Sequence, residues 1–200
     1  MLKNFFKKEK VCEKVSPEKF TQFNVKDALQ ELPVESIRRW QQYNSIPFSV
    51  AVYNTVRDFN LASIIRNASA FAFQEVNIIG WKKYDKRGAV GAYNYVKINH
   101  FPDFHSFTKY IGYHNIVSLE LPEHYPNVPE ASFVELSQFH WRSEYCLLVG
   151  EEGAGIPEQD LRKSFHKVKI SIPGSMRSLN AATSAGIAMY SASSYYNSIK

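Results

Sequence analysis

The sequence lacks long apolar runs and is poor in cysteine. No apolar run reaches about 18 residues, the length that a membrane-spanning helix requires, so we expect no membrane partner. Its two cysteines, Cys12 and Cys146, lie far apart and form no CxxC pair, which argues against a disulfide framework and fits a reducing, cytoplasmic location. The basic first residues contain no sustained apolar stretch with a small-residue cleavage site, so they do not predict a signal peptide.

The sequence also lacks a strong excess of either charge. Its 24 basic and 19 acidic residues give a net charge of +5 with histidine neutral. That balance permits a polyanionic partner but does not require one. With 44% apolar and 22% charged residues, the 200-residue chain has the composition of a folded globular protein. It is long enough to bury a substantial core without disulfides or a structural metal.

Residues 1–47 differ in composition from the rest of the chain. They are polar and charged and contain no convincing strand, and Ser16 followed by Pro17 is typical of a helix start. Apolar residues recur at helical spacing in 25–32, and the helical pattern resumes in 35–43 after a proline. We therefore expect a short helical N-terminal extension.

Over residues 48–200 the pattern changes to alternating strands and helices. Short β-type runs with apolar centres alternate with segments in which apolar residues recur at helical spacing. This order predicts a separate α/β domain with a mainly parallel sheet. The expected strands are 49–53, 75–80, 115–120, 144–150 and 167–172, and the expected helices are 61–73, 157–165 and 180–198.

Asn60 and Arg66 lie in a segment that follows the first expected strand of this domain and opens its first helix. Ligands of open α/β sheets bind at such carboxyl ends of strands, so both residues are candidates for a site. The pattern is equally compatible with structural roles. Asn60 occupies the position of a helix cap, and Arg66 is also typical of a side chain that extends to solvent or pairs with an acid.

Three glycines follow the strand expected at 144–150, in the sequence Gly150-Glu-Glu-Gly153-Ala-Gly155. Glycines permit positive φ angles and close approach of the backbone to a ligand. Their spacing is not the dinucleotide-binding GxGxxG, and no Walker Lys-Ser/Thr follows, which disfavours a nucleotide-binding protein. The two glutamates favour a neutral or cationic ligand over a pyrophosphate. The loop is also compatible with a tight turn whose glutamates interact with the dipole of the next helix.

A third segment runs from Ile170 through a Pro-Gly turn to a polar cluster that contains Ser178 and Asn180. The helix after it is rich in Ala, Ser and Gly, whose small side chains allow another backbone to approach closely. Ser178 and Asn180 are candidates for a site, and both are also typical helix-capping residues.

Together the three segments resemble the SpoU/TrmH family of SPOUT-class RNA 2′-O-ribose methyltransferases, over roughly residues 48–198. The family's motifs are Asn, five residues and Arg; an apolar strand followed by GxEGxG; and IxIPx followed by SLN and a helix of small residues. Phe59 and Ala62 depart from the Asp-Pro and Gly that the family often has around the first-motif Asn. The matching residues are Asn60, Arg66, Gly150, Glu152, Gly153, Gly155, Ile170, Ile172, Pro173, Ser178, Leu179 and Asn180.

The resemblance implies S-adenosylmethionine as the cofactor, no metal, and a C-terminal trefoil knot in the backbone. Knots are so rare that the residue pattern alone would not predict one. A homodimer formed through the knot region is also implied, and the small-residue helix at 180–198 is compatible with it. By the same resemblance, the cofactor contacts would come from Leu119, Gly150, Gly153, Ile170, Ile172 and Leu179.

The resemblance further implies a catalytic group that consists of Asn60, Arg66, Glu152, Ser178 and Asn180. The enzyme must align the ribose oxygen and help to remove its proton. Arg66 is expected at that oxygen, either as a base that is deprotonated when the substrate binds, or as a group that holds the adjacent phosphate and stabilises the forming alkoxide. A guanidinium is a poor base, so the second role is physically safer. The other members would orient Arg66 and the ribose, and Glu152 would shape the site.

A basic cluster with interleaved aromatic residues follows the strand expected at 75–80. Cations beside aromatic rings suit phosphate contact and base stacking, so we expect the cluster to bind RNA, although each residue is also typical of a solvated loop. The cations are Lys82, Lys83, Lys86 and Arg87, and the aromatic residues are Trp81 and Tyr84.

The resemblance implies a cytoplasmic RNA (ribose-2′-O)-methyltransferase that acts on tRNA or rRNA. The alternative is a non-catalytic RNA-binding or ribosome-assembly protein that retains the fold. The presence of every member of the expected catalytic group argues against that alternative.

Overall fold

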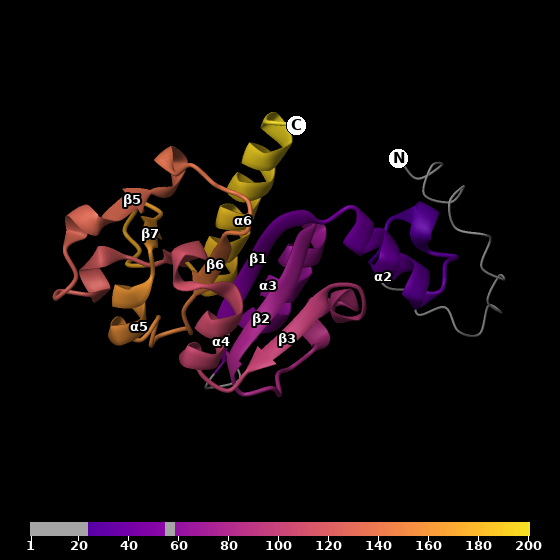
Figure 1. Ribbon diagram of the computed structural model, residues 1–200, viewed down its shortest axis with the longest axis horizontal. Helices are drawn as coiled ribbons and strands as arrows, with labels where there is room; N and C mark the ends of the chain where they lie inside the picture. Colours follow the sequence, from indigo (N-terminus) through magenta and orange to yellow (C-terminus); the bar gives the residue numbers. More distant parts are fainter. Residues whose placement is uncertain (1–23, 55–58) are drawn as a thin grey trace.

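The computed structural model of the chain describes residues 24–54 and 59–200 (Figure 1). The helix start expected at Ser16 lies outside the described residues. In the part that is described, no helix combines the length and the apolar character that crossing a membrane demands. The helix α2 (Val34–Tyr43) lies at one end of the molecule, and β5 and β7 lie at the other (Figure 1).

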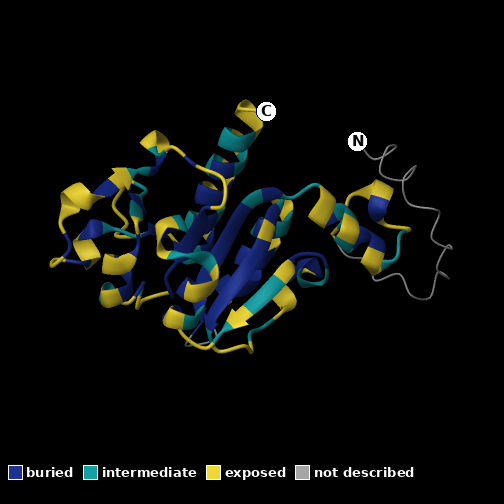
Figure 2. Ribbon diagram, viewed as in Figure 1, coloured by how far each residue is buried: buried dark blue, intermediate teal, exposed yellow. Residues whose placement is uncertain are grey.

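A seven-stranded sheet forms the centre of the molecule, and every pair of neighbouring strands in it is parallel. Its strand order is β3-β2-β1-β6-β4-β7-β5. Helices cover both faces, so the central strands are buried along nearly their whole length, and Figure 2 shows β1 and β2 almost entirely buried. The predicted α/β class is confirmed. The strands are β1 (Ile46–Asn54), β2 (Phe73–Gly80), β3 (Lys97–Phe101), β4 (Ile116–Leu119), β5 (Phe133–Glu135), β6 (Cys146–Val149) and β7 (His166–Lys169).

Alternate residues of the central strands supply two hydrophobic cores, one on each face of the sheet. Val50 and Val52 of β1 belong to the core that contains the apolar residues of α3 and α6. Ala51 and Tyr53 belong to the opposite core, with residues of α4 and α5. This alternation follows from the two-residue period of a strand. The other α-helices of the described residues are α3 (Asn60–Ala70), α4 (Phe104–Ile111), α5 (Glu158–Lys163) and α6 (Ala181–Ser198).

The sequence pattern did not predict β3, α4 or β5. The strands β3 and β5 are the two edges of the sheet, and both are short and largely unburied. The centre of β3 is polar and β5 has only three residues, so neither gives a clear apolar run. The helix α4 does carry a local signal. Asp103 caps it by accepting a hydrogen bond from the Ser106 backbone N–H at 2.7 Å, and Gly112 ends it with a φ of +81°.

The described part of the N-terminal extension is only partly helical. Its second half forms α2 as expected, but 25–32 contains only a 3-10 turn at Asp27–Leu29, so the helix expected there is wrong. The residue before the turn provides no side-chain cap, and Leu29 packs with Ile37 and Tyr95 in a small third core. The segment is therefore held by the packing of Leu29, and not by the apolar face of a helix. The strand β1 already begins at Ile46, slightly before the expected boundary at 48.

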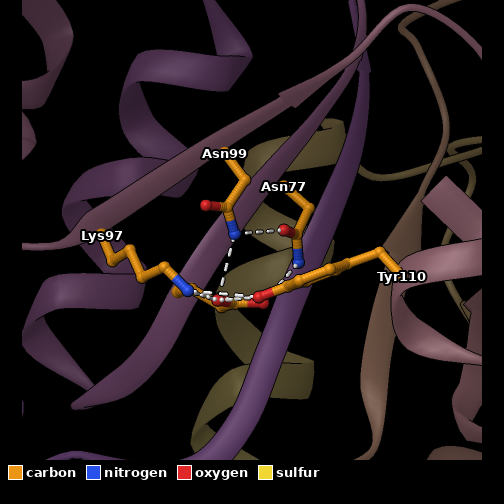
Figure 3. Close-up of polar contacts among 5 residues, drawn as sticks. Asn77, Lys97, Asn99 and Tyr110 are labelled. Atoms are coloured by element: carbon orange, nitrogen blue, oxygen red, sulfur yellow. Dashed lines mark hydrogen bonds and ion pairs between the residues drawn. The ribbon is translucent and has the colours of Figure 1, made fainter. Parts of the chain in front are cut away.

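A polar network lies between the sheet and α4 (Figure 3). Glu75 of β2 is 4% exposed, and its carboxylate accepts hydrogen bonds from Lys97 Nζ (2.8 Å), Asn99 Nδ2 (3.0 Å) and the Tyr110 hydroxyl (3.0 Å). Asn77 donates to the other carboxylate oxygen at 3.3 Å and accepts from Asn99 at 2.9 Å. The buried charge is therefore paired and hydrogen-bonded, as burial of a carboxylate requires.

Candidate active site

A cavity of about 460 Å³ lies at the carboxyl ends of β4, β6 and β7. The three strands are parallel neighbours, so the residues that follow them meet at one edge of the sheet. Glu152, Ser178 and Asn180 of the expected catalytic group line the cavity. All six residues expected to contact a cofactor line it too, namely Leu119, Gly150, Gly153, Ile170, Ile172 and Leu179.

The glycine-rich loop after β6 folds back on itself. Glu151 and Gly155 exchange two backbone hydrogen bonds, of 3.2 and 2.8 Å. Gly155 has a φ of +67°, a left-handed conformation that favours glycine. A Cβ atom at Gly150 would overlap the backbone of Gly155 and Ile156. The glycines therefore allow the tight fold of the loop, which places Glu152 at the cavity.

Glu120 and Tyr125 hold this loop from the end of β4. The Ile156 backbone N–H donates to Glu120 Oε1 (2.8 Å) and to the Tyr125 hydroxyl (2.9 Å), and that hydroxyl lies 2.9 Å from the Ile156 carbonyl oxygen, to which it donates. Burial raises the pKa of Glu120, although the bond from Ile156 lowers it in part. Burial also raises the pKa of Tyr125. Sequence reasoning missed both residues, because a glutamate after an apolar strand is ordinarily a solvated one.

Side chains from three distant segments meet at one edge of the cavity. The Asn60 amide donates to Glu152 Oε2 (2.5 Å), and the Asn180 amide donates to Asn60 Oδ1 (2.8 Å). Asn180 Oδ1 accepts from two backbone N–H groups in the first turn of α6, so Asn180 caps α6 and orients Asn60 together. Asn60 itself lies inside α3, whose N-cap position is Phe59 with no side-chain cap bond. The expected capping position of Asn60 is therefore wrong, and capping does not explain its side chain.

Arg66 does not join this group within one chain. Its side chain is exposed on α3 and does not line the cavity, and it makes no hydrogen bond or ion pair with another described residue. The neighbouring Asn67 donates to the Ala182 carbonyl at 3.2 Å, which fixes α3 against α6. Ser178 lines the cavity and is exposed. The catalytic roles of Arg66 and Ser178 stay predictions.

The loop that carries the basic cluster is anchored to the end of β1. The Asn54 amide donates to the carbonyl oxygens of Trp81 (2.5 Å) and Lys83 (3.2 Å). The strand β1 leads toward the Asn60 segment, so this anchor holds the cluster at the same edge of the sheet as the candidate site. Its four cations, Lys82, Lys83, Lys86 and Arg87, are exposed.

Two of these cations lie over aromatic rings. Lys86 Nζ lies 4.9 Å from the centre of the Tyr93 ring, and the Arg87 guanidinium lies 5.8 Å from the centre of the Phe59 ring. Arg87 also forms an ion pair with Asp85 at 2.6 Å. Phe59 is 64% exposed and directly precedes Asn60, so the structure brings the cluster close to the catalytic candidates.

His124 and Arg177 line the cavity and were not among the expected site residues. Arg177 lies in the polar cluster before α6, where its position directly before Ser178 was the available signal. Over residues 24–54 and 59–200, no group of three or more His, Cys, Asp or Glu side chains is arranged to hold a metal ion.

Comparison with known proteins agrees with the geometry. The sequence model of the SpoU rRNA Methylase family matches residues 47–190. The ribosomal RNA small subunit methyltransferase G 2 of Syntrophobacter fumaroxidans is 28% identical in an alignment of 175 residues that covers 84% of this chain and 32% of that protein. The chain therefore spans about a third of the length of this relative.

The fold is similar to that of solved methyltransferases. The AdoMet-bound rRNA methyltransferase from Sinorhizobium meliloti aligns with a TM-score of 0.61 and 24% identity, over 78% of this chain and 59% of that one. The TrmH/SpoU tRNA-modifying enzyme of A. aeolicus aligns with a TM-score of 0.69 and 20% identity, over 83% of each chain. These likenesses confirm the predicted fold class, and the trefoil knot stays a prediction.

Proposed function

The chain belongs to the SpoU rRNA Methylase family, and from that premise we propose that it transfers a methyl group from S-adenosylmethionine to a ribose 2′-hydroxyl of RNA. The observation that carries the proposal is the hydrogen-bonded chain of Glu152, Asn60 and Asn180 at the edge of the cavity. Residues from distant segments are held there in one orientation, as the alignment of a reacting group requires.

The cavity fits S-adenosylmethionine in size and in chemistry. Its volume of about 460 Å³ lies within the range of small-molecule pockets. Apolar side chains suit the adenosine, and carboxylates suit a cationic sulfur better than they suit a phosphate. When bound, the cofactor supplies a methyl group on that positively charged sulfur. The apolar lining includes Leu119, Ile170, Ile172 and Leu179, and the carboxylates are Glu120, Glu151 and Glu152.

The polar residues of this chain orient the RNA ribose and stabilise the charge that forms on its oxygen. Asn180 and Asn60 orient the ribose hydroxyl, and Glu152 fixes the Asn60 amide. Ser178, which lines the cavity, helps to orient the ribose. Arg66 holds the adjacent phosphate and stabilises the forming alkoxide. Its side chain lies outside the cavity of its own chain. Either RNA binding must move Arg66 toward the reacting oxygen, or the Arg66 of a second copy must reach it.

We include a homodimer in the proposal. Ile187 and Tyr190 lie on α6, the helix that Asn180 caps at the site, and they are 40% and 62% exposed. A second copy that packs on α6 would bury both side chains, and each buried apolar side chain would stabilise the dimer. A cytoplasmic location also belongs to the proposal, and the free, buried Cys146 is compatible with it.

The substrate that we propose is tRNA or rRNA, held in part by the basic cluster. The exposed Lys82, Lys83 and Lys86 suit contact with phosphates, and the exposed rings of Trp81 and Phe59 suit stacking of unpaired bases. Arg87 contributes less charge to such contact, because Asp85 already pairs with it.

Methyl transfer by the 200-residue chain tests the proposal. The chain is incubated with S-adenosylmethionine that carries a labelled methyl group and with tRNA or rRNA from cells that lack it, and the RNA is digested to nucleosides for mass spectrometry. We expect a labelled 2′-O-methylnucleoside. Asn180→Ala should lower the rate about 100-fold, because it removes the group that orients Asn60, and Asn197→Ala on the exposed end of α6 should not change it.

Other outcomes would assign a different function. Label on a base instead of a ribose would contradict the ribose specificity. RNA binding without any binding of S-adenosylmethionine would favour a non-catalytic RNA-binding protein that retains the fold.

A further inference from the structure

Arg177 differs in charge from the other residues of the cavity. Among the described residues that line it, Arg177 is the one arginine or lysine, whereas Glu120, Glu151 and Glu152 contribute three carboxyl groups. Arg177 lies between β7 and α6, three residues before Asn180, and the cap that Asn180 forms on α6 fixes the end of this segment. The backbone of this segment is therefore fixed at Asn180 beside the cavity, and the exposed Arg177 side chain lines the cavity three residues before that point.

The Arg177 guanidinium pairs with no acidic side chain in the described part of the fold. Arg38, Arg87 and Arg162 form ion pairs of 2.6–2.7 Å with acidic side chains. Arg177 makes no hydrogen bond or ion pair with any other described residue, although carboxylates line the same cavity. A cation that lines a pocket and has no such partner is available to a ligand.

We propose that Arg177 binds the carboxylate at the methionine end of S-adenosylmethionine, an inference that rests on the proposed function. The amino-acid end of this molecule carries one carboxylate and one ammonium group side by side. The cavity offers the complementary pair of charges, a single guanidinium among carboxylates. A guanidinium also binds a carboxylate through two parallel hydrogen bonds, which gives direction as well as attraction.

An RNA phosphate is the competing partner for Arg177. A polyanionic strand that enters the cavity would meet repulsion from Glu120, Glu151 and Glu152, whereas a zwitterion is attracted by both signs. The charges of the lining therefore favour the cofactor carboxylate over a phosphate.

Calorimetry with two matched ligands tests the inference. The full chain is titrated with S-adenosylmethionine and with decarboxylated S-adenosylmethionine, which lacks only the carboxylate. We expect the wild type to bind the first about tenfold more tightly, a size typical of one charge-assisted contact. Arg177→Ala should lose about that factor for S-adenosylmethionine and bind both ligands equally, and Arg177→Lys should lie between the two.

The control is Arg142→Ala, which removes the same charge from an exposed residue that does not line the cavity, and it should keep the wild-type ratio of the two affinities. Equal loss of affinity for both ligands in Arg177→Ala would overturn the inference, as would unchanged ligand affinity with weaker RNA binding. In either case the wild type still binds S-adenosylmethionine, so the proposed function survives. A wild type that binds neither ligand would overturn the proposed function, and the inference with it.

Discussion

At the scale of single residues, Glu75 makes stability depend on pH. Burial raises the pKa of its carboxyl group, but the hydrogen bonds from Lys97, Tyr110 and Asn99 outweigh that effect and lower the pKa below its ordinary value. A carboxylate whose pKa is lowered by folding stabilises the native state above its unfolded pKa of about 4.3, and that contribution is lost as the pH falls through the folded pKa.

We therefore predict that Glu75→Gln lowers the free energy of unfolding by about 1–2 kcal/mol at pH 7, because the amide cannot form the charged bond to Lys97. The difference from the wild type should shrink as the pH falls below about 4, where the wild-type carboxylate becomes protonated too. Urea unfolding at both pH values measures it. Glu123→Gln, at an exposed glutamate, is the control and should have little effect at either pH. An unchanged difference at low pH would contradict the linkage to Glu75.

The residues of the site divide into those that the sequence could reveal and those that it could not. Asn60, Glu152 and Asn180 belong to motifs, and the structure brings them together because each follows or opens an element at one edge of the sheet. The role of Glu120 could not be predicted from the sequence. Its bond to Ile156 depends on β4 lying beside β6, and β5 separates these two strands along the chain. Nothing local to Glu120 indicates that neighbour.

At the scale of elements, substitutions in the glycine-rich loop separate two effects of adding a methyl group, namely backbone strain at a positive φ and overlap with neighbouring atoms. Gly155→Ala places a side chain at a φ of +67°, and its Cβ would lie 2.5 Å from the Tyr125 hydroxyl and 3.0 Å from Glu120 Oε1. Gly153→Ala meets the positive φ of +83° but no atom within 4 Å. Gly174→Ala meets neither problem.

We predict a graded loss of stability over this series. Gly153→Ala should cost about 1–2 kcal/mol for the left-handed conformation, Gly155→Ala should cost more, and Gly174→Ala should be close to neutral. Thermal unfolding gives the order. Gly155→Ala should also weaken binding of S-adenosylmethionine at least tenfold, because it displaces the Glu120 and Tyr125 side chains that hold the loop. Equal stability of the Gly153 and Gly155 variants would show that the loop accommodates the methyl group.

The inner elements of the fold follow from the sequence better than its margins do. The strands β1, β2, β4, β6 and β7 and the helices α3, α5 and α6 were predicted close to their observed bounds. Burial on both faces makes β4 and β6 almost continuously apolar, whereas β7 is marked by the alternation of polar and apolar residues over 167–172. The edge strand β3 has a polar residue at its centre and β5 is only three residues long, so neither gives such a pattern. The turn at Asp27–Leu29 shows the opposite case, in which tertiary packing of Leu29 overrides a helical pattern.

At the scale of the whole molecule, the net charge of +5 does not by itself indicate where RNA would bind. The positions of the cations in the structure give that information. The cluster Lys82, Lys83 and Lys86 is exposed beside the candidate site, whereas Lys97 is taken up by the buried Glu75. Placement of the lysines therefore indicates more about RNA than their number does.

We predict that Lys82→Ala weakens RNA binding through the loss of one phosphate contact. The slope of the logarithm of affinity against the logarithm of salt concentration should fall in magnitude by about 0.7–0.9, the value for one neutralised phosphate. Lys109→Ala removes the same charge from α4, away from the cluster, and should leave the slope unchanged. Equal slope changes in both variants would mean that RNA responds to net charge alone, and a change confined to Lys82→Ala would place the RNA backbone at the basic cluster.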